Sequence, residues 1–372
     1  MAATKTAREL LPEAPSILAI ETGLLGELLV ITPALRAVKA TWPEASITVM
    51  VSPGSAPVLV ENPNVDRLLP LSKKERSGFT GLMRLASWIR AKRFDAVLVF
   101  HTSFRSALAA FMGAVPVRAG LAWEGRGFLL THKRPRDRSA YEADEHLRVA
   151  ELIGATARGR ELELFLTDDE RSEAASLLPD GQGRSLVCLH PGSSHENRRW
   201  PAERFAELGA RLRGSRGVDP VYAVGPRERN VAEAVERWYE QSRLNRPTVI
   251  HPRTVRILGG VFERSCAVVT NDTGPMHVAA AVGVPGVFLH GPIPVERWHP
   301  PGERYVTLVA DAVHCQPCDT SQCAQTSLLC MEAIDVDTVF EALSRLIESA
   351  SPFPRRAGIP DAIRVSTDSE SP

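Results

Sequence analysis

The sequence lacks several features that would assign it to other classes of protein. No run reaches the eighteen or more apolar residues that a membrane-spanning helix requires. Residues 1–16 hold no apolar core long enough for a signal peptide. The 44 Lys and Arg equal the 44 Asp and Glu, so no basic excess indicates binding to nucleic acid. These absences predict a cytoplasmic globular protein, and they leave peripheral contact with a membrane open.

Fingerprints of common enzyme classes are also missing. We find no H-E-x-x-H metalloprotease motif, no G-x-G-x-x-G dinucleotide loop and no Ser-His-Asp order. The loop Gly23–Gly26 resembles a phosphate loop only weakly, because the Lys-Ser/Thr ending of a P-loop is absent. A hydrolase or a dehydrogenase therefore receives little support.

Short apolar strands alternate with helical patterns along most of the 372 residues, which predicts an α/β fold with parallel sheets. The pattern starts again after a crossing near residues 154–166. We therefore expect two Rossmann-like domains, residues 15–165 and 166–350, facing each other across a cleft. Residues 351–372 are rich in Pro, Ser and charge, which predicts a disordered tail.

Three local expectations concern the first domain. The apolar pattern predicts one helix over residues 28–41, with Pro33 in its early part, where proline is tolerated. Residues 53–70 are predicted to be rich in loops. Residues 123–141 are predicted to be irregular and basic. That charge indicates either a solvated loop or a docking loop for an anionic partner.

The stretch from Cys266 to Gly283 carries the strongest functional signal. It predicts a buried strand, a turn over Thr270–Gly274, and a helix that begins at Pro275. Polar side chains then lie at the carboxyl end of a strand beside the positive end of a helix, where diphosphates bind. The candidate ligands are Asp272 for sugar hydroxyls, and Thr273, Gly274 and His277 for phosphate. The plainer interpretation is an ordinary capped helix.

A second turn of small residues, His190–Ser194, also follows a strand. Ser193 and Ser194 can donate hydrogen bonds to phosphate, and Arg198 and Arg199 bring guanidinium groups close by. The alternative is a surface loop with solvated arginines.

Two acidic residues lie where helices are expected to start. Glu27 could act as a general base, and Glu228 could hold the hydroxyls of a ribose. For both residues, the alternative is a favourable interaction between a carboxylate and the helix dipole.

Four of the six cysteines form a C-x2-C-x4-C-x6-C cluster: Cys315, Cys318, Cys323 and Cys330. In a cytosolic chain this cluster is a candidate structural metal site. Reduced thiols without metal are the leading alternative, and disulfides are less favoured in the cytoplasm. Four thiolates would leave zinc no open position for chemistry.

Together the motifs resemble glycosyltransferase family 9, the heptosyltransferases. The resemblance rests on Asn271–His277 with the Ala-Ala-Ala-Val-Gly-Val-Pro that follows, on Pro191–Ser194 with Arg198–Leu208, and on Gly26–Lys39. Three further features are similar to the heptosyltransferase II branch: Phe104–Leu108, Gly125–His132 and the cysteine cluster.

The resemblance implies a GT-B fold, with an acceptor-binding N-terminal domain and an ADP-sugar-binding C-terminal domain. It implies an inverting glycosyltransferase that transfers L-glycero-D-manno-heptose from ADP-heptose to the lipopolysaccharide inner core (Kdo/heptose-lipid A). No catalytic metal or other cofactor is implied. The implied location is the cytoplasm, peripheral to the inner membrane.

Roles for individual residues follow from the same resemblance. Glu27 matches the base of the family, which is an Asp there, and Arg198 matches a cation on the diphosphate. The remaining positions match donor-binding residues: Ser193, Ser194, Glu228, Asp272, Thr273, Gly274 and His277. Two alternatives are a heptosyltransferase with another acceptor, such as a protein, and a nucleotide-sugar-binding protein without turnover.

Overall fold

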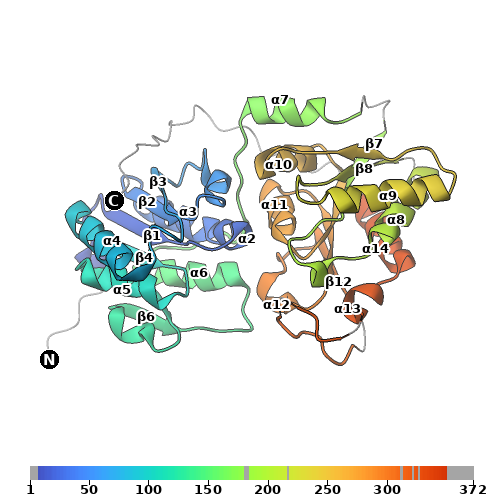
Figure 1. The fold of residues 1–372 in the computed structure, drawn as a ribbon. Coiled ribbons are helices and arrows are strands. Elements are labelled where there is room, and N and C mark those ends of the chain that lie inside the picture. The colour runs from blue at the N-terminus through green and yellow to red at the C-terminus, as the bar shows by residue number, and fades with distance from the viewer. Residues whose placement is uncertain are drawn as a thin grey trace. The chain divides into compact units, whose positions relative to one another are not determined.

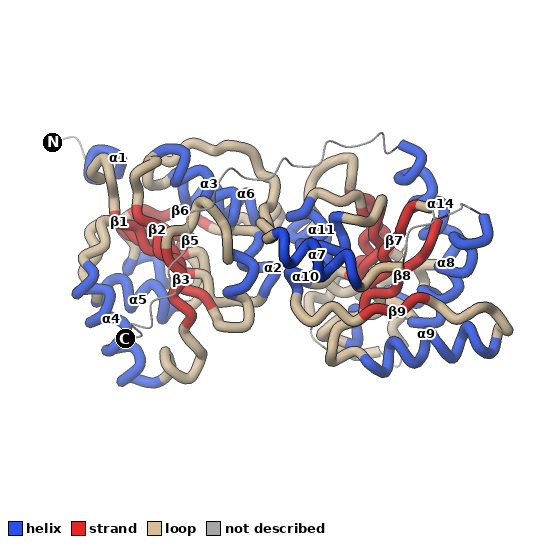
Figure 2. The backbone as a smooth tube through the Cα atoms, turned by 90° about the horizontal axis from the view of Figure 1, so that it is seen from above, coloured by secondary structure: helices blue, strands red, loops and turns tan. Residues whose placement is uncertain are grey.

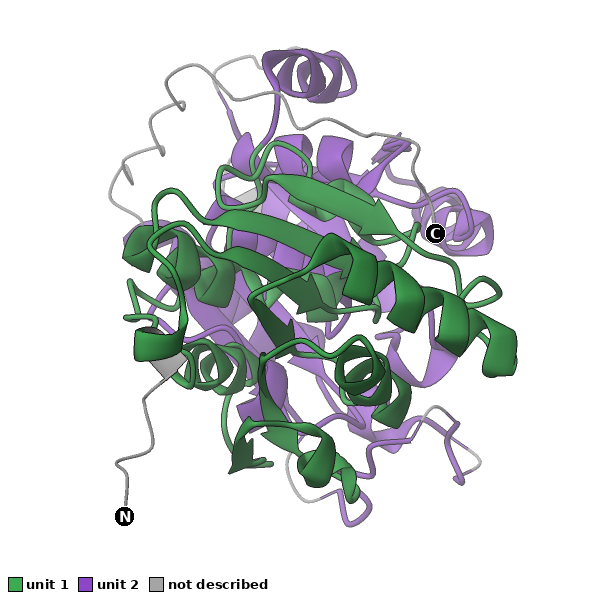
Figure 3. Ribbon diagram, turned by 90° about the vertical axis from the view of Figure 1, so that its left-hand side faces the viewer, with its two compact units in different colours: residues 1–165, 359–372 green, residues 166–358 purple. Residues whose placement is uncertain are grey.

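The computed structural model describes residues 7–179, 184–215, 218–310, 313–320, 322–325 and 327–349. The chain divides into two compact units, one ending at Phe165 and the next beginning at Leu166 (Figure 3). The tail 351–372, which the composition predicts to be disordered, lies outside the described residues.

In the first unit the described residues form a six-stranded parallel sheet with helices around it (Figure 1). The strands are β1 (Ser16–Ile20), β2 (Ser46–Val51), β3 (Arg67–Pro70), β4 (Ala96–Val99), β5 (Val117–Ala122) and β6 (His132–Pro135). The helices are α1 (Ala7–Leu10), α2 (Leu25–Leu29), α3 (Thr32–Thr41), α4 (Gly78–Lys92), α5 (Phe104–Met112) and α6 (Glu142–Glu151), with the 3-10 turns η1 (Ala56–Leu59) and η2 (Arg126–Leu129).

The second unit repeats this plan with another six-stranded parallel sheet. The strands are β7 (Ser185–His190), β8 (Val218–Ala223), β9 (Thr248–Ile250), β10 (Ala267–Asn271), β11 (Gly286–His290) and β12 (Tyr305–Val309). The helices are α7 (Asp168–Ser176), α8 (Ala202–Ser215), α9 (Arg229–Gln241), α10 (Val255–Glu263), α11 (Gly274–Val282), α12 (Val295–Trp298), α13 (Leu329–Glu332) and α14 (Val336–Ser349), with the 3-10 turn η3 (Glu196–Arg198).

The strand order shows where each sheet changes direction. It runs β3-β2-β1-β4-β5-β6 in the first unit and β12-β11-β10-β7-β8-β9 in the second. The order therefore reverses between β1 and β4, and again between β7 and β10. Open α/β sheets bind ligands at the carboxyl ends of the strands at such a reversal.

Apolar side chains bury both faces of each sheet, as near-continuous apolar strands require. The central strands β1, β4, β7 and β10 are almost wholly buried. In the first unit α3 packs with α6 and α4 packs with α5; in the second, α8 packs with α9 and α14, and α10 with α11 (Figures 1 and 2). Trp200 anchors the second core, with its Nε1 donating to Ile334 O at 2.8 Å.

The structure corrects three local expectations in the first unit. The expected helix over 28–41 is two helices, because the chain turns at Ile31 and Pro33 occupies the first turn of a new helix. The segment 53–70 contains η1 and ends in strand β3. The segment 123–141 contains η2 and strand β6.

None of the helices in the described part of the chain combines the length and the apolar character that crossing a membrane requires.

Gly209 provides a test of the packing in the second unit. A Cβ at this position in α8 would lie 1.9 Å from the hydroxyl of Tyr222, which is 3.1 Å from the Tyr239 hydroxyl. Gly209→Ala should therefore lower the free energy of unfolding by about 1–3 kcal/mol through overpacking, measured by denaturant titration.

Gly214, in the same helix, is the matched control, because a Cβ there would meet nothing within 4 Å. Gly214→Ala should leave stability unchanged or raise it by up to about 1 kcal/mol. Equal effects of the two substitutions would contradict this account of the core.

Candidate functional site

The side chain of Asn271 joins the two loops that follow β7 and β10. Its Nδ2 donates to Pro191 O at 3.0 Å and to Gly192 O at 3.1 Å, and its Oδ1 accepts from Trp200 N at 3.0 Å. All three bonds are buried. They hold the loop 191–200 against the end of β10, so the two predicted motifs of the second unit do come together.

The structure distinguishes the two neighbouring arginines of that loop. Arg199 supports the backbone, because its Nε and Nη2 both donate to Ser193 O, at 2.9 and 2.6 Å. The Nε of Arg198 is buried and has no hydrogen-bond partner among the described residues. Arg198 is also close enough to Asp272 to oppose the rise in the pKa of that carboxyl. Arg198 is therefore the cation that remains available to a ligand.

The two serines of the loop differ as well. Ser193 is buried, and its Oγ accepts from His195 N at 3.2 Å, which stabilises the turn. Ser194 is exposed, and no hydrogen bond of its side chain is found in the described structure. Ser194 presents an unengaged hydroxyl, and the Ser193 hydroxyl, which accepts in this contact, still has its O–H to donate.

Helix α11 begins with its amino end uncapped by a side chain. Thr273 is the N-cap residue, yet its Oγ1 does not accept from the helix; it donates to Asn271 O at 3.4 Å. Pro275 in the first turn has no N–H to satisfy. The backbone N–H of Gly274 and the helix dipole are thus left for an anionic group.

Asp272 lies next to this helix and is buried, as is His277 within it. Burial raises the pKa of Asp272 and lowers the pKa of His277 to about 4, so His277 is neutral at neutral pH. Asp272 Oδ2 and His277 Nδ1 both lack hydrogen-bond partners in the described structure, as do both ring nitrogens of His290. Buried polar atoms without partners are uncommon in native proteins and indicate a missing ligand or water. We call Arg198, Asp272, Thr273, Gly274, His277 and His290 the second-unit site.

Glu228 lies beside the same turn. Its Oε2 accepts from Gly225 N at 2.9 Å and is 3.7 Å from Nε2 of His190. A Cβ on Gly192 would lie 2.0 Å from Glu228 Oε1. Only glycine at position 192 leaves room for this carboxylate at the mouth of the loop.

In the first unit, Glu27 lies in the first turn of α2. Its Oε2 accepts from Leu24 N at 2.7 Å, and no other hydrogen bond of Glu27 is found among the described residues. The contact agrees with the helix-start interpretation, and it leaves one carboxylate oxygen available for proton transfer.

Glu21 is a second carboxyl beside Glu27, and its residue type alone does not single it out. A Cβ on Gly23 would lie 2.3 Å from Glu27 Oε2 and 2.9 Å from Glu21 Oε1, so both carboxyls crowd one α-carbon. Glu21 is 3% exposed and accepts from Gly23 N at 2.8 Å. Burial, and then the charge of Glu27, raise the pKa of Glu21 well above its usual value. Its position at the end of β1 was the only available signal.

A pocket opens at the carboxyl ends of β1 and β4. Its polar lining comprises Thr22, Arg76, Ser103, Arg105 and Ser106. Arg76 Nη1 donates to Thr22 Oγ1 at 2.9 Å, and Arg105 Nη2 donates to Gly78 O at 2.7 Å. Neither guanidinium has an ion-pair partner within the described ranges, so the pocket suits an anion.

The basic segment 123–141, in contrast, is largely neutralised from within. Arg134 pairs with Glu145 at 3.1 Å, Arg136 pairs with Glu142 at 2.7 Å, and Arg138 lies over the Trp123 ring at 4.6 Å. Arg126 is fully buried and donates to backbone carbonyls. These contacts favour neither the solvated loop nor the docking loop as the main role of the segment.

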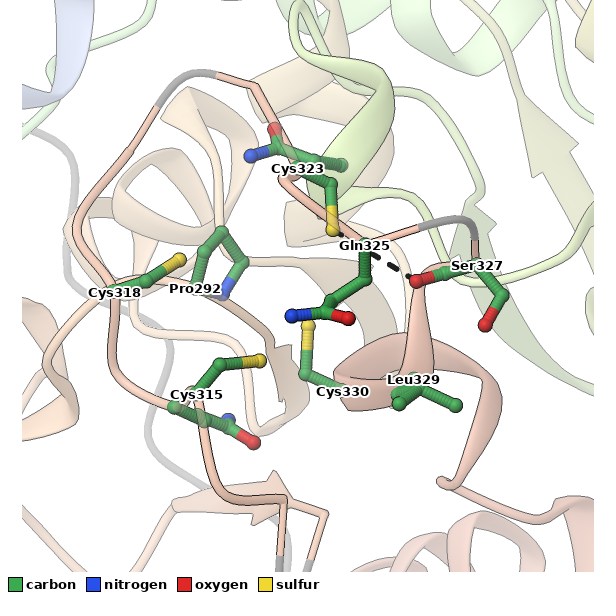
Figure 4. A pocket seen from close by; sticks show the side chains of 10 residues that line it. Pro292, Cys315, Cys318, Cys323, Gln325, Ser327, Leu329 and Cys330 are labelled. Atoms are coloured by element: carbon green, nitrogen blue, oxygen red, sulfur yellow. Dashed lines mark hydrogen bonds between the residues drawn. The ribbon is translucent and has the colours of Figure 1, made fainter.

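The four clustered cysteines line one small pocket in the second unit (Figure 4). Cys323 Sγ donates to Ser327 O at 3.7 Å, and Cys318 Sγ is 3.3 Å from Thr320 Oγ1. All four are free thiols. Among the residues that the structure describes, no group of three or more His, Cys, Asp or Glu is arranged to hold a metal ion. The candidate metal site therefore gains no support from this arrangement.

The buried state of Glu21 predicts a pH-dependent stability. A carboxyl whose pKa is raised by folding binds its proton more tightly in the folded state than in the unfolded state. Its contribution to the free energy of unfolding is therefore present at low pH and is lost as pH rises above about 4.5. Glu21→Gln stays neutral and avoids this loss. The melting temperature of the wild type should therefore fall relative to Glu21→Gln as pH rises from about 5 to 8.

Glu75 is the control, because its hydrogen bonds to Ser72 lower the pKa of its exposed carboxyl. Glu75→Gln should not reproduce the widening difference over the same pH range. A constant difference between wild type and Glu21→Gln would show that Glu21 is not a buried acid.

Comparisons with known proteins agree with the resemblance in the sequence. A family model described as Glycosyltransferase family 9 (heptosyltransferase) matches residues 82–329. The chain is 28% identical over 288 residues to lipopolysaccharide heptosyltransferase 2 of Salmonella typhimurium, covering 74% of this chain and 82% of that protein. It is 24% identical over 287 residues to a lipopolysaccharide core heptosyltransferase of Haemophilus influenzae, covering 76% of this chain and 80% of that one.

Solved structures agree on the fold. The ADP-heptose lipopolysaccharide heptosyltransferase II of E. coli matches with a TM-score of 0.71 and 23% identity, over 90% of this chain and 98% of that chain. A family 9 glycosyl transferase from Veillonella parvula matches with a TM-score of 0.77 and 24% identity, over 94% and 100%. The predicted α/β fold of the GT-B type, with two Rossmann-like halves, is confirmed. Because the family model covers more than half of the sequence, this chain belongs to glycosyltransferase family 9.

Proposed function

We propose that this enzyme transfers L-glycero-D-manno-heptose from ADP-heptose to the lipopolysaccharide inner core, with inversion and without a catalytic metal. The observation that carries the proposal is the second-unit site. There a free arginine and an uncapped helix end lie beside a buried carboxylate, within the sequence motifs of the family. The names of the relatives, which are lipopolysaccharide heptosyltransferases, support the choice of donor and acceptor.

On the donor side, the diphosphate of ADP-heptose would lie at the amino end of α11. Gly274 N and Arg198 offer hydrogen bonds and positive charge to its oxygens. Ser194 contributes an exposed hydroxyl, and Glu228 is placed to accept from a ribose. These groups stabilise the negative charge that develops on ADP as it departs.

On the acceptor side, Glu27 is proposed as the general base. It removes the proton of the acceptor hydroxyl while that oxygen attacks the anomeric carbon, and the bond from this carbon to the phosphate oxygen breaks. The products are the glycosylated acceptor, with inverted configuration, and ADP. Glu has one more methylene than the Asp of the family, and the bond from Leu24 N to Glu27 Oε2 fixes the longer side chain.

The anionic groups of the acceptor, phosphate or Kdo carboxylate, would bind the pocket of Arg76 and Arg105. Ser103 and Ser106 line the same pocket and can donate hydrogen bonds. This role makes the first unit the acceptor-binding domain and the second unit the donor-binding domain. A lipid-linked acceptor further implies work at the cytoplasmic face of the inner membrane, by peripheral contact.

Removal of the base tests the mechanism. Glu27→Gln keeps size and hydrogen bonding but cannot take a proton, so ADP release from ADP-heptose with purified acceptor should fall about 10²–10⁴-fold. Binding of ADP-heptose, measured by calorimetry, should stay within about twofold.

Glu27→Asp is the conservative control and should retain part of the activity, since the carboxylate remains. Binding without ADP release in wild type and Glu27→Gln alike would instead favour a non-catalytic binding protein. Turnover with a protein acceptor but not with the lipid core would reassign the acceptor.

The two arginines of the loop give a second test. Arg198→Gln should weaken ADP binding about tenfold to a hundredfold, the cost of a charge-assisted hydrogen bond to phosphate. The exposed Arg253 already pairs with Glu173 at 2.7 Å, and Arg253→Gln should leave ADP affinity unchanged. If both variants bind ADP like wild type, Arg198 does not contact the diphosphate.

A further inference from the structure

His290 and Asp272 lie side by side at the carboxyl ends of neighbouring strands. The register of β10 and β11 pairs Asn271 with Leu289, and Asp272 N donates to Leu289 O at 2.9 Å. The next residue on each strand therefore points from the same edge of the sheet. Nδ1 of His290 is 3.7 Å from Oδ2 of Asp272, which is too long for a hydrogen bond.

Both groups are buried, and neither is satisfied. His290 is 0% exposed and Asp272 is 3% exposed. In the described structure, Asp272 Oδ2 and both ring nitrogens of His290 have no hydrogen-bond partner. Leaving such groups unpaired is costly, and a third group that bonds to both members of the pair would satisfy them.

The protonation states define what that third group must be. Burial, followed by the positive charge of Arg198, lowers the pKa of His290 to about 3, so the ring is neutral at neutral pH. Burial raises the pKa of Asp272, and the positive charge of Arg198 opposes that rise. Where Arg198 keeps Asp272 ionised, its carboxylate only accepts, whereas a neutral imidazole offers one N–H donor and one acceptor. A group between Asp272 Oδ2 and His290 Nδ1–H must therefore donate to the first and accept from the second.

A hydroxyl group meets this requirement and a phosphate does not. A hydroxyl has one donor and two acceptor sites, and its oxygen can lie about 2.8 Å from both atoms of the pair. A phosphate oxygen would only accept, and its charge would be repelled by the carboxylate of Asp272. Within the second-unit site, the diphosphate therefore belongs to Arg198 and α11, and the hydroxyl belongs to the pair.

We propose that His290 is a sugar-recognition residue, which together with Asp272 binds one hydroxyl of the transferred sugar. The proposal rests on the proposed function, because it takes ADP-heptose as the donor. It assigns His290 to the sugar half of the donor and assigns it no contact with ADP. His290 thereby contributes to the choice between ADP-heptose and free ADP, and between sugars that differ at this hydroxyl.

Calorimetric titration with ADP and with ADP-heptose tests the assignment. His290→Phe keeps an aromatic ring and removes the N–H, so affinity for ADP-heptose should fall about tenfold while affinity for ADP stays within about twofold. His290→Asn places an amide N–H near the position of Nδ1 and should recover most of the loss. The melting temperature of each variant reports whether it folds.

His299 provides the matched control, because its ring lies 6.4 Å from that of His290 and its Nδ1 already contacts Thr307 Oγ1. His299→Phe should change affinity for the two ligands by equal factors. Equal factors for His290→Phe, or no change in its affinity for ADP-heptose, would overturn the proposal and leave the proposed function intact. A wild-type protein that binds no ADP-heptose would overturn both.

Discussion

The buried amide of Asn271 is the contact on which the second-unit site depends. A single side chain satisfies two carbonyls and one N–H of the loop 191–200 from the end of β10. The central strands β7 and β10 are already adjacent in the sheet, and the amide extends their pairing into the loops beyond. Buried hydrogen bonds thus hold the loop that carries Arg198 against the strand that leads into α11, an arrangement that is already formed before an anion binds.

In the first unit, too, side chains bind the backbone of a loop at the end of a central strand, and here the side chains are carboxyls instead of an amide. The turn after β1 places two successive N–H groups, of Gly23 and Leu24, against Glu21 and Glu27. The two carboxyls meet over an α-carbon that carries no side chain. Burial, and then the charge of Glu27, raise the pKa of the more deeply buried Glu21.

The central strands and the loops at their ends could be predicted from the sequence. A short apolar run such as Ala267–Val269, followed by turn residues, is compatible with few structures other than a buried strand. The edge strands β3 and β6 were missed for a physical reason. Edge strands need no continuous apolar run, and β3 and β6 carry charge and end in proline, which protects exposed edges. The roles of Arg198 and Arg199 could not be separated either, since the bond from Arg199 to Ser193 O exists only in the folded loop. Glu21 and His290 stand out only because their side chains are buried, and residue type alone does not predict that burial.

The unpartnered polar atoms of the second unit also affect how long the protein persists in the cell. A ligand that satisfies them binds the folded unit and not the unfolded chain, and at a hundred times its dissociation constant it adds about 2.7 kcal/mol to stability. Turnover by proteases depends on how often a protein opens. A higher concentration of sugar nucleotide would then lengthen the lifetime of this protein as well as raise its reaction rate. A cell with little sugar nucleotide would contain less of the protein.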